Sequence, residues 1–483
     1  MLQKPLFTTA FIGAAFVGLS PAFADLSPNQ ALERYFDLST SMGAELSVGL
    51  KEELNGVVRW RDVVISNDID GAVSTSTLDW IEAAPENKDT VKITIGPKAF
   101  VETVSPDASE PPINFEMKFK DNEIFVSEEG ELLNWTYAMD QVTMQSISAD
   151  QNAPFDMTVT MNDMTGRYEL NGETYLEGGA NFGSIEMEMM VDEDDTQGNI
   201  LFNASSAVVD FSADLPENED YSGYLTGEKN ANLTYKIADY VWDTNFNSPD
   251  DGNVAFRAST GLSAGTLTVQ EGAIAILGET QDIAYAIQPP IPGMPQMNAS
   301  AKGMNANGSI TIGKPGEVAP MAMALSIEDL VLDDAIWGMF DPTGAIPRDP
   351  ASLRLDFSAD ALWLTDDFMS SAESGEPPLM PQSLELSELF LTVGGASITA
   401  SGSGVLSAET GVPSGAGTLE LRGVLGLIQT MSQAGLIPVP QAMMAQGMLP
   451  QFTRPGDDGS DHLISDLEAR PDGSIYVNGT RVK

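Results

Sequence analysis

The sequence predicts a mainly β protein built on a long, twisted and curved antiparallel sheet, with one helix near the N-terminus and two near the C-terminus. Between residues 347 and 427, apolar and polar residues alternate in successive short runs, as half-buried strands require. Gly and Ser fill the intervals between these runs, which favours turns between antiparallel neighbours. Helical spacing is found near the two ends of the chain. The strands are expected to form one sheet or two β-rich halves.

The N-terminal helix is predicted from its start signals. Ser27 is a suitable N-cap and Pro28 takes the first helical position. An apolar stripe at helical spacing follows, made of Ala31, Leu32, Tyr35, Phe36 and Leu38. We expect this helix to end near Gly43 and to pack over one end of a sheet.

Strands are predicted from residue 45 onward, with clean alternation at Val91, Ile93 and Ile95. Between residues 139 and 215 the strands are rich in methionine. The pattern places Met157, Val159 and Met161 on one face, and Met187 and Met189 on another. Methionine fills irregular apolar space and also lines adaptable binding surfaces. A core and a ligand groove are therefore both open interpretations of these residues.

One spacing of apolar residues recurs along the chain. It is two, three, two in Leu325, Ile327, Leu330 and Leu332, and again in Leu384, Leu386, Leu389 and Leu391. A partial copy is Val159, Met161 and Met164. An acidic residue precedes the third apolar position in each copy: Asp329, Glu388 and Asp163. A spacing of apolar residues that changes from two to three and back to two predicts a β-bulge.

Proline marks the best candidate boundary between two halves. The segment from Gln288 to Pro295 contains four prolines, which cannot join a central ladder. We therefore predict an N-terminal half over residues 25–287, a connection over 288–297 and a C-terminal half over 298–483. The last half is expected to end in two helices, from Val424 and from Pro440, and a hairpin of residues 462–467 and 475–477.

The first residues resemble a secretory signal peptide. Lys4 precedes an apolar run from Leu6 to Leu19, and Ala22-Phe23-Ala24 has the small-x-small form of a cleavage site. The alternative is an uncleaved anchor, but a run of about 14 residues is short for a span of about 20. We expect cleavage after Ala24 and a soluble, exported, periplasmic protein.

Charge restricts the partners. The chain has 71 Asp and Glu against 23 Lys and Arg, a net charge of −48, and such a surface repels phosphate backbones and anionic headgroups. Nucleic acid is therefore excluded as a partner. The acidic excess is expected to maintain solubility, and binding of multivalent cations is the alternative. The chain has no Cys, which does not discriminate between compartments for a protein of this size.

The motifs that could carry chemistry are weak. His462 is the only histidine, so a histidine-based triad or metal site would depend on it, and an ordinary strand-end role is expected. Residues 261–265 match the letters of a nucleophile elbow, but a strand rather than a helix follows them. Asp192-Glu193-Asp194-Asp195 lacks the glycine and glutamate of a calcium loop and indicates a solvated hairpin turn. We assign no catalytic, cofactor-binding or metal-ligating residue.

Three segments resemble a known family. They are Gly344-Ala345-Ile346-Pro347-Arg348-Asp349-Pro350 with the strand after it, residues 423–438, and Asp472-Gly473-Ser474-Ile475-Tyr476-Val477-Asn478-Gly479. Together they resemble the domain of unknown function 2125 family of exported alphaproteobacterial proteins, from the signal peptide to the last residue. The strand-rich chain with closing helices also resembles, at the level of the fold, the AsmA-like envelope proteins, whose curled sheets are thought to hold lipid. The family implies no catalytic residues.

The sequence therefore predicts a non-enzymatic periplasmic protein that acts in envelope maintenance and shelters lipid or another apolar molecule along a sheet face. One alternative is a structural or interaction module with acidic loops. Another is a carbohydrate-active hydrolase with paired carboxylates, which 71 acidic residues neither favour nor exclude.

Overall fold

The computed structural model forms two compact units. Unit 1 comprises residues 1–218 and 242–250, and unit 2 comprises residues 219–241 and 251–483. The structure describes residues 26–483 except 42–43, 70–71, 107–111, 131, 148–154, 173, 194–195, 216–221, 249–251, 292, 366–376, 408–410 and 457–460. Within this part of the chain, no helix is long and apolar enough to cross a lipid bilayer. The signal-like segment lies outside the described residues.

The predicted fold class is confirmed, because most described residues lie in strands and helices occur at the predicted ends. Unit 1 contains helix α1 (Pro28–Ser41) and strands β1 to β12. Their bounds are β1 (Glu45–Leu54), β2 (Val57–Ile69), β3 (Ala72–Pro85), β4 (Thr90–Ile95), β5 (Lys98–Val104), β6 (Ile113–Glu129), β7 (Leu132–Ser146), β8 (Phe155–Asn171), β9 (Tyr175–Phe182), β10 (Ser184–Glu193), β11 (Thr196–Ala204) and β12 (Ser206–Asp214).

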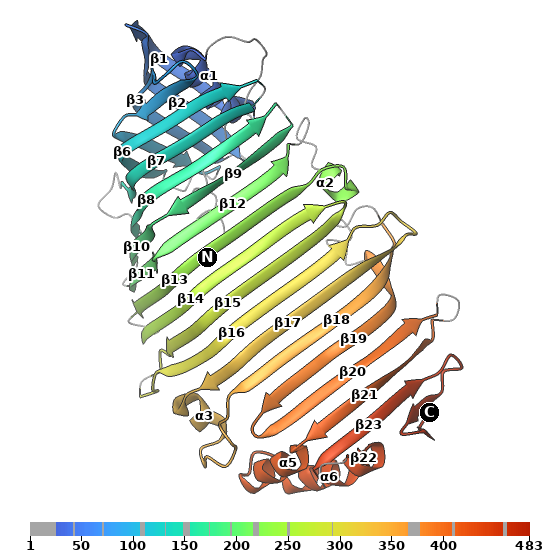
Figure 1. Ribbon diagram of the computed structural model, residues 1–483. Coiled ribbons are helices and arrows are strands. Elements are labelled where there is room, and N and C mark those ends of the chain that lie inside the picture. Colours follow the sequence, from blue (N-terminus) through green and yellow to red (C-terminus); the bar gives the residue numbers. More distant parts are fainter. Residues whose placement is uncertain are drawn as a thin grey trace. The chain divides into compact units, whose positions relative to one another are not determined.

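Pairing in unit 1 is antiparallel and branches twice. β3 pairs with β2 on one side and with both β4 and β5 on the other, and β4 and β5 each pair with β6. β7 then joins β6 to β8. β8 pairs with β10 over its first half and with β9 over its second. The first branch curls the strands around an interior that α1 covers (Figure 1).

Helix α1 begins as its sequence predicts. The Ser27 hydroxyl accepts from the Gln30 amide at 3.4 Å, and the Ser27 amide donates to Oε1 of Gln30 at 3.0 Å. This reciprocal pair is a capping box. The helix directs Leu32 and Phe36 into the strands, where both are almost fully buried, and Phe36 stacks on Trp60 with ring centroids 5.8 Å apart. The main buried hydrophobic cluster of the described residues lies here, and the second lies around Val101, Phe115 and Met157, also in unit 1.

The methionines of unit 1 differ from the prediction in one respect. Met187 pairs with Val159 and Met189 pairs with Met157, so these residues share one face of the sheet instead of lying on different faces. They pack in or against the second cluster. The core interpretation therefore describes them.

Unit 2 contains strands β14 to β25 in an antiparallel arrangement. Strand β13 (Ala231–Ser248) contributes residues to both units. The other bounds are α2 (Ser222–Thr226), β14 (Gly252–Gln270), β15 (Ala273–Gln288), β16 (Met297–Thr311), β17 (Val318–Leu332), α3 (Asp334–Phe340), β18 (Ala351–Trp363), β19 (Leu379–Val393), β20 (Ala396–Leu406), β21 (Pro413–Arg422), α5 (Val424–Gln433), α6 (Val439–Phe452), β22 (Arg454–Pro455), β23 (His462–Ala469), β24 (Ile475–Val477) and β25 (Thr480–Arg481).

Consecutive strands from β14 to β21 pair with one another, and β21 then pairs with β23. Helices α5 and α6 and the closing hairpin of β23 and β24 are found where the sequence predicts them. Helices α2 and α3 are additional. The proline-rich segment at residues 288–297 connects the paired strands β15 and β16, so the expected boundary falls inside unit 2. Prolines fit this position because a connecting loop needs no ladder amides.

The predicted β-bulges are present at the two full copies of the apolar spacing. On β17, the three-residue step from Ile327 to Leu330 faces a two-residue step on β18. On β19, the step from Leu386 to Leu389 faces a two-residue step on β20. One extra residue on the bulged strand returns the following apolar side chains to the same face. In the partial copy, the three-residue interval from Met161 to Met164 on β8 pairs with an interval of three residues on β7. Neither strand therefore contains an extra residue there.

Aspartate occupies the left-handed backbone position in many of these irregular strands. Asp62, Asp121, Asp163, Asp239, Asp282 and Asp329 have φ between 45° and 52°. Asp tolerates this conformation better than most residues. Three of these aspartates face a glycine of a neighbouring strand: a Cβ at Gly49, Gly183 or Gly261 would lie 3.0, 2.8 or 2.9 Å from the facing Asp side chain. The aspartate at positive φ and the facing glycine together allow the strand backbone to bend away from the regular extended conformation at these positions.

We expect Asp329→Val to lower the stability of unit 2 by roughly 1–3 kcal/mol, because a β-branched side chain is strained at positive φ. Asp329→Gly is the control, since glycine adopts this backbone freely. The measurement is the urea midpoint followed by circular dichroism. Equal midpoints for Asp329→Val and the parent protein would contradict the strained-kink assignment.

We expect the same truncation, Phe to Ala, to lower the free energy of unfolding by different amounts in the two units. Phe36→Ala removes a fully buried ring of unit 1 and is expected to cost about 3–5 kcal/mol. Phe357 on β18 is only half-buried, so Phe357→Ala should cost about 1–2 kcal/mol. Chemical denaturation of both variants checks this difference, and a Phe357→Ala loss as large as that of Phe36→Ala would show that unit 2 has a closed core.

Candidate functional site

Strand register in unit 2 brings apolar side chains from many strands onto one face of the sheet. Directly paired residues lie on the same face of an antiparallel sheet. One such row runs through Leu267, Ile276, Gly308, Met323, Phe357, Leu386, Gly402, Gly417 and Leu467. A parallel row runs through Val269, Ile274, Ile310, Met321, Ala359, Leu384, Gly404, Gly415 and Ala469. We call this surface the apolar face.

Two further rows extend the apolar face toward α5 and α6. They are Gly265, Gly278, Ala306, Leu325, Leu355, Leu389, Ala400, Leu419 and Ser465, and Ser263, Thr280, Met304, Ile327, Leu353, Leu391, Ile398, Leu421 and Leu463. The four rows contain no charged residue, although the chain carries a net charge of −48. The bulge on β19, between Leu386 and Leu389, keeps the apolar side chains on both sides of it on the same face, whereas the bulge on β17 lies beyond Ile327 and outside the four rows.

Large side chains of the apolar face remain exposed. Ile276 is 57% exposed, Leu384 is 50% exposed and Met323 is 41% exposed. Among the large side chains of the apolar face, those of Leu421 and Leu463, near α5 and α6, are buried. Both buried hydrophobic clusters of the described residues lie in unit 1. The described residues of unit 2 therefore present apolar area that none of them covers.

The opposite face of the same strands is polar. One row there joins Ser309, Ala322, Ser358, Glu385, Ser403, Ala416 and Glu468. Another places Arg354 between Ser326 and Phe390, and the Arg354 guanidinium donates to Glu388 at 3.0 Å. The Arg354 pKa is raised chiefly by this hydrogen bond. The two faces of the sheet thus differ sharply in polarity.

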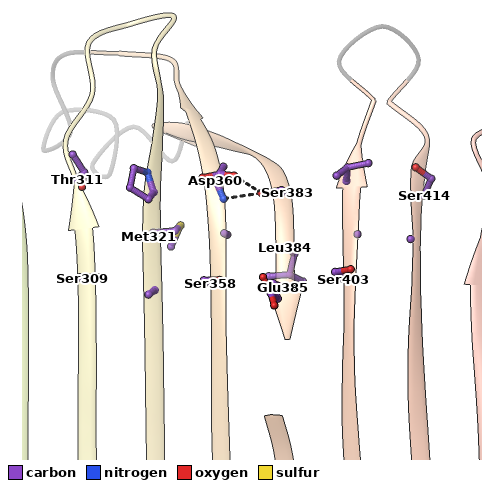
Figure 2. Close-up of a pocket in the computed structure, with 16 residues that line it drawn as sticks. Ser309, Thr311, Met321, Ser358, Asp360, Ser383, Leu384, Glu385, Ser403 and Ser414 are labelled. Atoms are coloured by element: carbon purple, nitrogen blue, oxygen red, sulfur yellow. Dashed lines mark hydrogen bonds between the residues drawn. The ribbon is translucent and has the colours of Figure 1, made fainter. Parts of the chain in front are cut away.

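A pocket of about 520 Å³ crosses β16 to β21 at the end of the sheet away from α5 and α6 (Figure 2). Most of its lining residues, such as Ser309 and Thr311, belong to the polar face, and Met321 and Leu384 of the apolar face also line it. Its side chains include Ser358, Ser403 and Ser414. The Ser383 hydroxyl donates to Asp360 at 2.7 Å and accepts from the Asp360 amide at 3.1 Å.

The chemistry of this pocket is that of neutral hydroxyls beside two carboxylates. Asp360 and Glu385 are both exposed, whereas the general acid of a glycosidase is kept protonated by an apolar surrounding. None of the lining residues is His, Lys or Arg, so the basic groups beside these hydroxyls are the exposed carboxylates of Asp360 and Glu385. The pocket can donate and accept hydrogen bonds.

His462 is the first residue of β23 and is buried. Its Nε2 lies 3.4 Å from Oε2 of Glu420 on the adjacent strand. Its ring packs so closely on Gly456 that a Cβ there would lie 2.0 Å from Nδ1. These contacts hold His462 as a packed residue at a strand end, the role expected from the sequence.

The other weak motifs lie in strands. Residues 261–265 fall inside β14, so the elbow letters are not followed by a helix. Asp192 and Glu193 end β10 and pair with β11, whereas Asp194 and Asp195 lie outside the described residues. Across the described ranges, no three His, Asp or Glu residues gather in a way that could hold a metal ion.

The family-like segments hold the end of unit 2 together. The Asp341 carboxylate accepts from the Ile346 and Ala345 amides at 2.8 and 3.1 Å, which lowers its pKa. This fixes the loop between α3 and β18, where Arg348 pairs with Asp334. Near the C-terminus, Asn478 accepts from the Asp466 amide at 2.9 Å. These motifs are structural in the geometry seen here.

The polar pocket was not predicted, and the sequence predicted an apolar sheet face without the register that joins its strands. Alternation along Met321, Met323, Leu325 and Ile327 is visible in the sequence and could have extended the predicted strands. No pattern in the sequence predicts that Ser309, Ser358 and Glu385 lie close together. They do so only because of the register between strands that are distant in the chain.

Residues 255–482 match the family described as an uncharacterized protein conserved in bacteria, DUF2125. No curated protein and no solved structure gives a significant match. The match covers unit 2 from β14 onward, whereas the sequence motifs predict a resemblance along the whole chain. The looser likeness to AsmA-like envelope proteins stays a prediction. The chain therefore carries, across residues 255–482, the domain of the DUF2125 family that its sequence motifs predict.

Proposed function

We propose that this protein is an exported, periplasmic, non-enzymatic protein of envelope maintenance that shelters a lipid or another elongated apolar molecule on the apolar face of unit 2. The single observation that carries the proposal is the combination of area and exposure on this face. Four rows of side chains without a charge remain partly open to solvent, and exposed apolar surfaces of this extent mark binding sites.

Unit 1 supplies the comparison. Its strands present a similar apolar surface, and α1 with Leu32 and Phe36 covers it. A ligand that covers Ile276, Met323 and Leu384 would do for unit 2 what α1 does for unit 1. Each large apolar side chain that becomes fully buried contributes about 1.5–3 kcal/mol, so a few contacts suffice for specific retention.

The shape and chemistry of the face favour an alkyl chain over a compact ligand. Glycine and alanine alternate with large residues in the rows, for example Gly402 and Gly417 beside Leu386. The surface offers few hydrogen-bonding side chains, since Ser263, Thr280 and Ser465 are the polar members of the four rows.

Two further parts of the proposal, export and a non-enzymatic role, are supported by different observations. The segment of residues 1–24 has the pattern of a signal peptide, and the family resemblance is to exported proteins. The polar pocket holds exposed carboxylates and no basic side chain among its lining residues. Binding is therefore the activity that the described residues support best.

The chain offers a matched pair of variants for testing the apolar face. Ile276 and Leu384 lie on it and are 57% and 50% exposed, while Leu277 and Val405 lie on the opposite face and are 50% and 55% exposed. We expect Ile276→Asp with Leu384→Asp to weaken binding of a fluorescent phospholipid at least about tenfold, since tenfold corresponds to about 1.4 kcal/mol. Leu277→Asp with Val405→Asp should change it less than about twofold.

The measurement is a fluorescence titration of each variant, with circular dichroism to show that the sheet is retained. Equal affinities for the two double variants would contradict lipid binding on the apolar face. So would a parent protein that does not bind the probe at all.

A further inference from the structure

Helices α5 and α6 form the longest uncharged part of a strongly charged protein. Residues 423–453 contain no Asp, Glu, Lys, Arg or His, although the chain has 71 acidic and 23 basic residues. Arg422 precedes this segment and Arg454 follows it. The segment folds as two consecutive helices at one end of β20, β21 and β23 in unit 2 (Figure 1).

Helix α6 exposes the large apolar side chains of this segment. Met443, Met444 and Met448 are 67%, 61% and 48% exposed, and Val439 and Phe452 are also exposed. The small Ala442 is the buried residue of the helix. The polar residues of the helix are the uncharged Gln441, Gln446 and Gln451, and its methionines are exposed to solvent, although a mostly apolar helix surface is normally buried in a core or in a membrane.

The helices are held firmly in this arrangement. The Asp461 carboxylate accepts from the Leu425 and Gly426 amides, each at 3.0 Å, and so caps the start of α5. The Phe452 carbonyl at the end of α6 accepts from the Ser465 hydroxyl at 2.8 Å and from Nδ2 of Asn478 at 3.1 Å. The exposed methionines are therefore presented by a fixed helix.

The same contacts connect α6 to the apolar face. Ser465 belongs to one of its four rows, paired with Leu419, and Leu421 and Leu463 are buried nearby. The exposed surface of α6 thus lies at the edge where the apolar face ends. An apolar molecule leaving that edge would meet α6 next.

We propose that α6 docks unit 2 on a lipid bilayer, with Met443, Met444 and Met448 inserted among the acyl chains. A protein with a net charge of −48 is repelled by anionic headgroups, and this uncharged segment is where its surface can approach a bilayer without that cost. Flexible methionines adapt to an irregular apolar partner. Arg422 and Arg454, with side chains 46% and 51% exposed, flank the segment as basic residues flank membrane-contacting helices.

This inference goes beyond the proposed function, because docking does not require that the apolar face hold a ligand. The test is flotation of the purified full chain with phosphatidylcholine vesicles. We expect the parent protein to float, and Met443→Glu with Met444→Glu to reduce the floated fraction at least about fivefold, since each buried charge opposes insertion. The charge-matched control is Leu50→Glu with Met190→Glu, two residues of unit 1 that are 49% and 50% exposed, and it should float like the parent.

Lipid charge and salt separate this mechanism from others. At low salt, binding to phosphatidylglycerol vesicles should be weaker than binding to phosphatidylcholine vesicles. The difference should shrink in 0.5 M salt, because the Debye length is then only about 4 Å. Ile276→Asp with Leu384→Asp should still float, which separates docking from ligand binding on the apolar face.

Several results would overturn the docking proposal. They are a parent protein that does not float with any vesicle, a helix variant that floats like the control, and binding that depends on anionic lipid. Light scattering adds one more: self-association in the absence of vesicles that Met443→Glu with Met444→Glu abolishes, without any vesicle binding, would assign the α6 surface to a second copy of the chain.

Discussion

The register of antiparallel strands is the constraint on which the rest of this structure depends. Alternation alone gives each strand two faces, and a slip of one residue would send its apolar side chains to the other face. The bulge on β19 inserts the residue that corrects such a slip between Leu386 and Leu389, and the bulge on β17 does the same beyond Ile327, outside the four rows. With this register, apolar residues from β14 to β23 fall into continuous rows, and the polar residues gather on the opposite face.

The two units handle an apolar sheet face differently. In unit 1, strands curl and branch around an interior that α1 covers, and Trp60, Ile81 and Val63 are fully buried. In unit 2 the strands continue as a simple meander whose apolar side chains stay partly exposed. A sheet that leaves so much apolar area open gives up free energy that its own folding could have gained. The binding role that we propose would account for this exposed apolar area.

Sequence predicted the local features of the fold well. The Ser27 cap, the alternating strands, the bulges near Asp329 and Glu388 and the two C-terminal helices all follow from residues close in the chain. Register between distant strands does not, so the shared face of Met157 and Met189 and the pocket around Ser358 were missed. Helix α3 was missed because it is only 7 residues long, and short helices depend on local capping such as the bond from the Ile336 amide to Asp333 more than on periodicity.

The central claim is that an apolar ligand covers the open face of unit 2. Native mass spectrometry of the protein, purified from its native cells without detergent, tests this most directly. The account predicts a mass above that of the polypeptide, with the excess released by organic solvent and identified as a lipid or another long-chain apolar molecule. A spectrum that shows only the bare polypeptide would contradict it.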